Sequence, residues 1–178
     1  RDMTQKELRD KLGYVPQKGV LFSGTIDSNI RYGKPEITDA QVKEAAEVAQ
    51  ATEFIDTKPE KYKSPVSQGG TNVSGGQKQR LSIARAIAKD PEIFIFDDSF
   101  SALDFKTDSQ LRKALKEYTK DATTVIVAQR ISTILGADQI IVLDDGHMAG
   151  IGTHKELMAN CEVYQQIARS QLSEEELA

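Results

Sequence analysis

Apolar residues along this chain follow two spacings, one typical of buried strands and one typical of helices. Apolar runs dominate the segments at residues 93–96, 123–128 and 139–143. Between them, residues 104–118 carry apolar side chains three or four positions apart, and residues 131–135 begin a shorter helix. Continuous apolar strands separated by helices predict an α/β fold, with a parallel sheet that helices cover on both faces.

The first half of the chain is predicted to be mostly helical. A short strand at residues 13–17 stops at a proline, and Thr38 opens a helix with a capping-box pattern. Apolar residues at helical spacing recur through residues 81–88. We expect the basic side chains of that last helix, Arg80 and Arg85 among them, to form a solvated face; the less favoured alternative places Arg80 or Arg85 near a phosphate.

Composition and charge exclude several classes of protein. The chain has 178 residues, enough for one domain with a core. Its 23 Lys and Arg against 27 Asp and Glu give a net charge of −4, so we expect no nucleic-acid partner. The single cysteine, Cys161, excludes an internal disulfide. No stretch approaches the twenty or so apolar residues that a membrane-spanning helix needs.

The most informative stretch is VSGGQKQR, at residues 73–80. Serine, two glycines and glutamine open a helix, whose first backbone N–H groups form an anion site that glycine lets a phosphate approach closely. Further along, the apolar strand at residues 93–96 ends in Asp97 and Asp98, as expected where an α/β protein holds a metal-bound nucleotide. Taken alone, the Ser-x-x-Gln pattern is also an ordinary capping box.

Together these stretches resemble the ATPase domains of ABC transporters. Residues 73–77 resemble the LSGGQ signature, with Val in place of Leu. Residues 93–98 resemble the Walker B strand, and residues 101–104 the D-loop. Residues 22–30, FSGTIDSNI, resemble the F-x-G-T-I-x-x-N-I run of exporter-type members, which lies beside the groove that receives the transmembrane coupling helix.

The resemblance covers essentially the whole chain and implies its organisation. It implies a partial P-loop NTPase (RecA-like) parallel sheet with an inserted helical subdomain. Residues 1–17 would be a core remnant ending in the Q-loop, residues 18–88 the helical subdomain with the signature, and residues 89–178 the core with Walker B, D-loop and switch. The sequence contains no G-x-x-x-x-G-K-[ST] phosphate loop (Walker A), so we expect a fragment, about the C-terminal two-thirds of the family's domain. The missing strand is expected beside the Walker B strand.

The resemblance also implies which residues form the site and which cofactors they serve. ATP and Mg²⁺ would be bound, and each position below matches one in a family motif. The positions are Asp98 and Gln129 for catalysis, Gln17, Ser74, Gly75, Gly76, Gln77 and Asp104 for nucleotide binding, and Gln17 and Asp97 for the metal.

Two catalytic positions depart from the family pattern. Asp98 stands where the family has a glutamate that acts as base or orients water, and Gln129 stands in place of the switch histidine. Aspartate is one methylene shorter, and a misplacement of about 1 Å can slow a reaction by on the order of 100-fold. Glutamine, unlike histidine, cannot titrate near neutral pH. We therefore expect the degenerate ATP site of a heterodimer, although a homodimer stays open.

The leading hypothesis is the nucleotide-binding domain of an ABC exporter, coupling ATP binding and hydrolysis to transmembrane export at the cytoplasmic face of the cell membrane. Expected partners are a second ABC ATPase domain, from a different subunit, and the coupling helices of a transmembrane domain. This chain alone is expected to be inactive. The alternative is a non-catalytic assembly module that contributes only a signature surface to a partner. A soluble ABC protein acting on DNA or ribosomes is disfavoured by the net charge and by residues 22–30.

Overall fold

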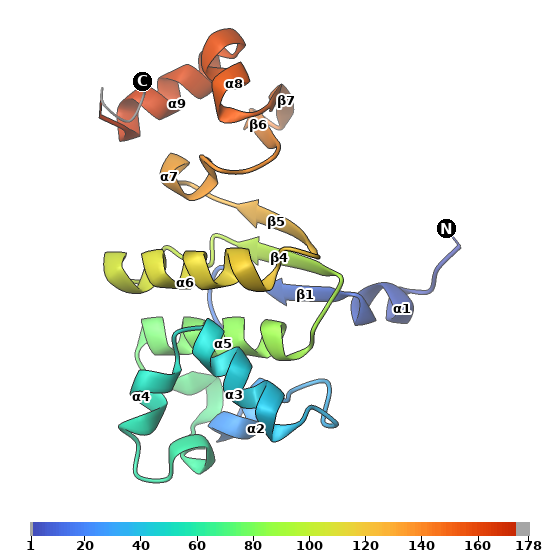
Figure 1. Ribbon diagram of the computed structural model, residues 1–178, viewed down its shortest axis with the longest axis vertical. Helices are drawn as coiled ribbons and strands as arrows, with labels where there is room; N and C mark the ends of the chain where they lie inside the picture. Colours follow the sequence, from blue (N-terminus) through green and yellow to red (C-terminus); the bar gives the residue numbers. More distant parts are fainter. Residues whose placement is uncertain (1, 174–178) are drawn as a thin grey trace. The chain divides into compact units, whose positions relative to one another are not determined.

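The structure is a computed structural model that describes residues 2–173. Contacts divide the chain into two compact units, Arg1–Val127 and Ala128–Ala178, and each is described here by itself. Figure 1 shows the order of helices and strands along the chain.

The first unit is built on a parallel sheet of three strands in the order β1-β4-β5, which confirms the predicted α/β class. The strands are β1 (Leu12–Val15), β4 (Ile93–Asp97) and β5 (Thr123–Val127). Strand β4 is central, because β1 pairs with one of its edges and β5 with the other. The expectation of a missing strand beside the Walker B strand is therefore wrong, since both edges of β4 are occupied.

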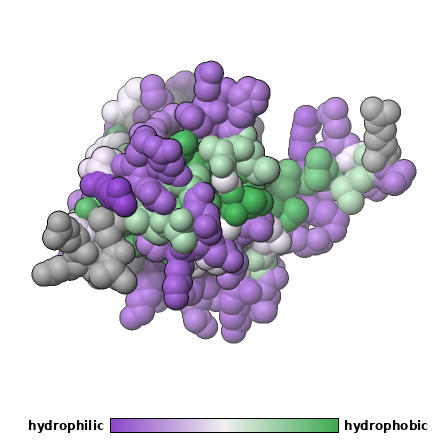
Figure 2. All heavy atoms as spheres, turned by 90° about the horizontal axis from the view of Figure 1, so that it is seen from above, coloured by the Kyte–Doolittle hydropathy of each residue, from purple (hydrophilic) through white to green (hydrophobic). Residues whose placement is uncertain are grey.

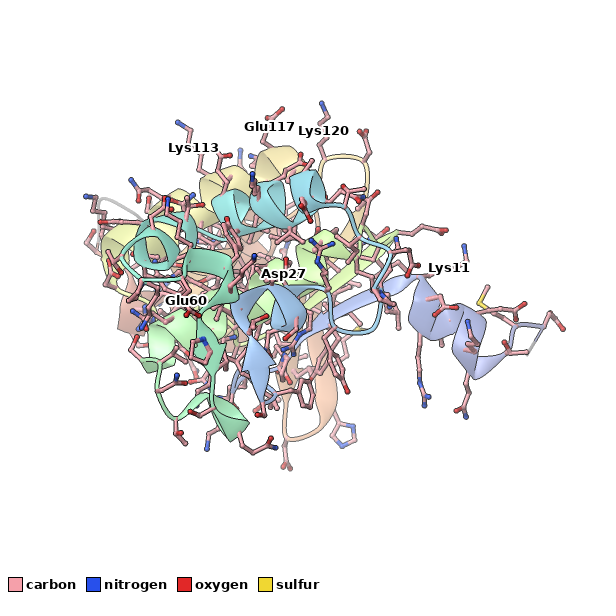
Figure 3. All side chains as sticks on the ribbon, turned by 90° about the horizontal axis from the view of Figure 1, so that it is seen from below. Lys11, Asp27, Glu60, Lys113, Glu117 and Lys120 are labelled. Carbon is pink, nitrogen blue, oxygen red and sulfur yellow. The ribbon has the colours of Figure 1, made fainter. Side chains whose placement is uncertain are left out.

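Helices cover one face of this sheet. The register places Val15, Phe94 and Phe96 on that face, and each is at most 1% exposed. They pack with helices α5 (Gly75–Ala88) and α6 (Phe105–Tyr118). The opposite face of α6 is solvated, as the outward-pointing Lys113 and Glu117 show in Figure 3.

The other face of the sheet is not covered by the described helices of the first unit. Tyr14, Val125 and Val127 share this face and are 55%, 47% and 52% exposed. Within the first unit, helices therefore cover one face of the sheet and not both, although the strands are as apolar as doubly covered ones.

The inserted segment between β1 and β4 is mainly helical. Its helix α5 packs against α2 and α3, and the predicted capping box of Thr38 and Gln41 is formed. The short elements of this unit are α1 (Gln5–Asp10), β2 (Gly24–Thr25), α2 (Ile26–Ile30), α3 (Asp39–Val48), α4 (Thr52–Asp56), η1 (Lys61–Lys63), β3 (Pro65–Val66) and η2 (Gln68–Gly70).

The second unit has its own core, around Leu157, Tyr164 and Ala168. Strand β6 (Ile140–Asp144) forms at the predicted place but pairs antiparallel with β7 (His147–Gly152). It therefore belongs to a hairpin and not to the parallel ladder. The helices are α7 (Ile131–Ile134), α8 (His154–Asn160) and α9 (Glu162–Gln171).

The hairpin of the second unit exposes apolar side chains on one face. Ile141, Leu143 and Met148 are 57%, 68% and 61% exposed. In Figure 2, hydrophobic residues lie at the surface between hydrophilic ones. Exposed apolar side chains that share one face of a hairpin favour association.

Candidate functional site

The start of α5 is built by the serine and glutamine of the signature. Ser74 Oγ accepts a hydrogen bond from the Gln77 amide at 3.2 Å, and Gln77 Oε1 accepts one from the Ser74 amide at 3.1 Å. This reciprocal capping box satisfies two N–H groups. The amides of Gly75 and Gly76 also lie in the first turn, where an N–H group has no intrahelical partner. They are suited to an anion at the helix N-terminus.

The two glycines are not explained by packing within the chain. A Cβ at Gly75 would meet nothing within 4 Å, and one at Gly76 would lie 3.5 Å from the Ala102 carbonyl oxygen, an ordinary contact. Neither glycine has a positive φ. Glycine in a helix costs up to about 1 kcal/mol relative to alanine. Close approach of a group from outside the chain is a physical reason to keep both glycines.

The D-loop residues lie against this first turn of α5. The Ala102 carbonyl faces Gly76, and Leu103 is buried beside it. Asp104 caps helix α6, because its carboxylate accepts the Thr107 amide at 2.9 Å. That backbone hydrogen bond lowers the pKa of Asp104. Signature and D-loop thus form one continuous surface, and the carboxylate within it favours the ionised state.

A second group of predicted site residues meets at the carboxyl ends of β1 and β4. Because the two strands are parallel neighbours, the segments that follow them leave the sheet at the same edge. The Gln17 amide nitrogen donates to Asp98 Oδ2 at 3.0 Å. The hydroxyl of Tyr14 donates to Asp97 Oδ2, also at 3.0 Å. This hydrogen bond is the main cause that raises the pKa of Tyr14.

The turn after β4 is held by contacts to both neighbouring strands. Asp98 has φ of 45°, in the left-handed region where aspartate is enriched among non-glycine residues. Its amide donates to the Val127 carbonyl at 2.9 Å. The fully buried Ser99 donates through its hydroxyl to the Val15 carbonyl at 2.9 Å. These contacts fix the backbone of the turn, and with it the position from which the Asp98 side chain extends.

Sequence reasoning missed Tyr14 and Ser99. Tyr14 could have been found from the two-residue period of strands, since it pairs in register with Ile95 and so shares a face with Asp97. Nothing in the sequence marks Ser99, whose partner carbonyl is 84 residues away.

Gln129 lies in the second unit, where helix α9 holds the segment around it. Gln171 Nε2 donates to the Gln129 carbonyl at 2.9 Å, and Gln171 Oε1 accepts the Ile131 amide at 2.9 Å. One side-chain amide therefore fixes the backbone on both sides of Arg130. Gln171 was also missed, because a glutamine in a C-terminal helix gives no local signal.

Comparison with known proteins decides the family. Residues 1–101 match the family described as "ABC transporter". The chain belongs to the ABC transporter family. The resemblance inferred from the signature, Walker B and D-loop is thereby confirmed, and with it the association with ATP binding and transport.

The similar proteins are longer than this chain. It is 45% identical over 174 residues to an uncharacterized ABC transporter ATP-binding protein of Mycobacterium tuberculosis, covering 96% of this chain and 30% of that protein. It is 45% identical over 167 residues to a Staphylococcus aureus protein provisionally named a multidrug export ATP-binding/permease protein, covering 94% and 29%. The chain thus spans less than a third of the length of these relatives.

A solved structure agrees in fold as well as in sequence. A bacterial Atm1-family ABC exporter with ATP bound matches with a TM-score of 0.92 and 40% identity, over 97% of this chain and 30% of that one. The fold of residues 2–173 is therefore that of an ABC exporter ATPase domain.

The oxygen donors near Asp98 fit the magnesium–nucleotide group that ABC transporter ATPase domains bind. Among residues 2–173, no three His, Cys, Asp or Glu side chains cluster as a metal site. Magnesium, however, commonly takes one or two carboxylates and completes its shell with phosphate oxygens and water. The carboxylate of Asp97 and the amide oxygen of Gln17 would supply the protein ligands. The bound ion would neutralise charge on the phosphates.

A pocket of about 300 Å³ elsewhere in this ABC transporter domain contains none of the predicted site residues. Its lining includes Tyr14, Tyr32, Arg85 and Lys89. Lys89 already donates to the Leu12 carbonyl at 2.9 Å, so the pocket offers few free donors and we assign it no ligand. Within the described residues, none of the helices combines the length and apolar character needed to cross a membrane.

Proposed function

We propose that this chain is the nucleotide-binding domain of an ABC exporter and couples ATP binding and hydrolysis to transmembrane export. The observation that carries the proposal is the first turn of α5, where Gly75 and Gly76 leave room that the chain itself does not fill. A phosphate approaching two unpartnered amides at a helix start explains both glycines.

The exporter assignment draws on the segment that resembles exporter-type members. In residues 22–30, Thr25 and Ser28 form a capping box, and Asn29 is buried at 1% exposure. The segment is thus a defined structure, and we assign to it the contact with a coupling helix. The similarity to an Atm1-family exporter and to a protein named for export and permease function supports the same assignment.

We further propose that the domain works in an asymmetric pair. In a head-to-tail dimer, Gln17, Asp97, Asp98 and Gln129 would serve this chain's own ATP, and residues 74–77 would serve the partner's. The altered catalytic positions weaken the first site, whereas the signature of the second is intact. The partner would then be a different subunit, with glutamate and histidine at the matching positions. The pair would sit at the cytoplasmic face of the membrane.

The functional division of the chain follows from the same proposal. Residues 1–17 would end in the Q-loop, residues 18–88 would form the helical subdomain, and residues 89–178 would supply Walker B, D-loop and switch. The division differs from the two contact units because it groups residues by their role toward ATP.

The proposal is tested by measuring ATP hydrolysis by the transporter that contains this chain, with and without a second, different ATPase subunit. We expect activity that requires the second subunit. Full activity of this subunit as a homodimer would overturn the asymmetric assignment. Absence of ATP-dependent activity in every combination would favour the non-catalytic assembly module.

A further inference from the structure

Arg85, in the signature helix α5, is half-buried, and all three nitrogens of its guanidinium group donate hydrogen bonds. Its Nε donates to the Asn29 carbonyl at 2.8 Å, its Nη1 to the Val20 carbonyl at 2.9 Å, and its Nη2 to Asn29 Oδ1 at 3.0 Å. The expectation that Arg85 belongs to a solvated face is therefore wrong. Helix α5 is tied instead to the segment of residues 20–32.

Two aromatic rings of the same segment complete the site around Arg85. Phe22 and Tyr32 stack with ring centroids 4.1 Å apart and an interplanar angle of 16°. The guanidinium carbon of Arg85 lies 5.2 Å from the Phe22 centroid and 5.4 Å from the Tyr32 centroid. Both distances are within the range of cation–π attraction.

The charge of Arg85 is partly buried, which costs it part of its hydration. Among the ion pairs within residues 2–173, none joins Arg85 to a carboxylate. Loss of water on burial lowers the pKa of Arg85. A charge withdrawn from water needs polar contacts in exchange, and here two backbone carbonyls, an amide oxygen and two ring faces contact the guanidinium group.

The segment that Arg85 holds is closed on itself by Asn29. The Asn29 side chain accepts the Phe22 amide at 2.9 Å and donates to the carbonyls of Phe22 at 2.9 Å and Thr25 at 3.0 Å. Because Asn29 also contacts Arg85, any displacement of the arginine acts on the whole of residues 20–32.

Arg80, on the same helix, makes the same kind of contact with a different segment. Its Nη1 donates to the Gln50 carbonyl at 2.6 Å, and its guanidinium carbon lies 4.9 Å from the Phe54 ring centroid. Arg80 therefore ties α5 to the junction of α3 and α4. It provides a matched control for Arg85.

We propose that Arg85 is a positioning residue that couples the signature to residues 20–32, so that a displacement of α5 moves that segment with it. Ser74 and Arg85 stand at the two ends of one continuous helix. A helix of this length spans roughly 20 Å and moves as a stiff rod. The inference rests on the proposed function, in which the signature meets a nucleotide and residues 20–32 face the transmembrane part.

The first test uses this chain alone and measures backbone hydrogen exchange in Arg85→Lys and Arg80→Lys. Lysine keeps the charge but loses the planar fork of donors. We expect Arg85→Lys to speed exchange within residues 20–32, at the Phe22 amide for example, by roughly tenfold or more. Arg80→Lys should speed exchange near Gln50 instead. Uniform acceleration in both variants would mean that Arg85 is only a packing residue and would overturn the proposal.

The second test uses the transporter that contains this chain, with ATP, Mg²⁺ and vanadate as the probe. In wild type and Arg80→Lys, exchange is expected to change both at residues 74–77 and at residues 20–32. In Arg85→Lys the change at 74–77 should persist and the change at 20–32 should be lost. A retained response at 20–32 would overturn the coupling role.

If Arg85→Lys fails to fold, a second variant still tests the inference. Tyr32→Ala removes one aromatic face from Arg85 at a ring that is 55% exposed, and it should give the same local effect with a smaller size. No local effect of Tyr32→Ala on residues 20–32 would count against the proposal. If wild type shows no response to nucleotide at residues 74–77, the proposed function fails, and the chain-alone measurement still decides the role of Arg85.

Discussion

The side-chain amide of Gln17 donates a hydrogen bond of 3.0 Å to the carboxylate of Asp98. The contact joins the segment after β1 to the residue that follows the Walker B strand. It gives the carboxylate of Asp98, one methylene shorter than a glutamate's, a fixed direction. Asp98 is thus positioned by its neighbours. Its carboxylate is held at a defined place, one methylene closer to the backbone than a glutamate carboxylate would be.

Restoring the family residues at this site is expected to raise its turnover. In a Ser74→Arg background, which silences the opposite site, Asp98→Glu with Gln129→His should increase ATP hydrolysis. A positioned base contributes roughly 10²–10⁴-fold. Asp98→Asn is the control, because it keeps an acceptor for Gln17 but supplies no base, and it should give no gain. Equal rates for the restored and unrestored proteins would contradict the degenerate-site assignment.

The uncovered face of the sheet predicts self-association of this chain. Tyr14, Val125 and Val127 present apolar surface beside the unpaired edge that β5 has within the described residues. Sedimentation should detect dimers or larger species in wild type and mostly monomer in Val125→Lys. Lys113→Ala, on the solvated face of α6 in Figure 3, should change nothing. A monodisperse wild-type monomer would show that this face does not drive association.

The chain as given should not be stabilised by nucleotide. Stabilisation by a ligand requires a concentration well above its dissociation constant. Gln17 and Asp97 supply metal contacts, but the sequence holds no glycine-rich phosphate loop to grip the phosphates. Millimolar ATP with Mg²⁺ is therefore expected to leave the melting temperature unchanged. A saturable rise would mean that the described residues carry more of the affinity than proposed.

The burial of Tyr118 predicts a loss of stability at high pH. Burial raises the pKa of Tyr118 from its ordinary 10.0 to about 12. The folded state therefore binds this proton more tightly than the unfolded state. The resulting stabilisation is complete below pH 10 and is lost as the pH rises to about 12. Urea unfolding at a series of pH values should show this decline in wild type and a smaller one in Tyr118→Phe, which has no proton to lose.

The features that could be predicted from sequence are those whose partners are close along the chain. The capping boxes at Thr38, Ser74 and Thr153 each join residues three apart and are all formed. The parallel sheet followed from apolar runs, but which strand lies beside β4 did not. The order of strands depends on which distant segments pair, and the composition of the strands does not predict that pairing.

Contacts between distant residues were accessible only through the family resemblance, or not at all. The meeting of Gln17 with Asp98 spans 81 residues and was suggested by matching motifs. The partial burial of Arg85 was not, since a basic residue on an amphipathic helix is ordinarily solvated. Its partners lie 56 and 65 residues earlier in the chain, and only the folded arrangement brings them together.

The signature serine is predicted to affect hydrolysis beyond its role in the helix. Ser74 and Thr38 cap α5 and α3 by the same capping box, each with a glutamine three residues later. Loss of either cap in Ser74→Ala or Thr38→Ala should destabilise the protein by about 0.5–2 kcal/mol. Ser74→Arg should in addition abolish most ATP hydrolysis at the partner's site, because a bulky side chain would occupy the place where the γ-phosphate docks. Thr38→Arg should leave hydrolysis intact, since α3 faces no nucleotide in the proposed dimer. Unfolding measurements and ATPase assays on the assembled transporter separate the two effects, and wild-type hydrolysis in Ser74→Arg would refute the assignment of residues 74–77 to the partner's ATP.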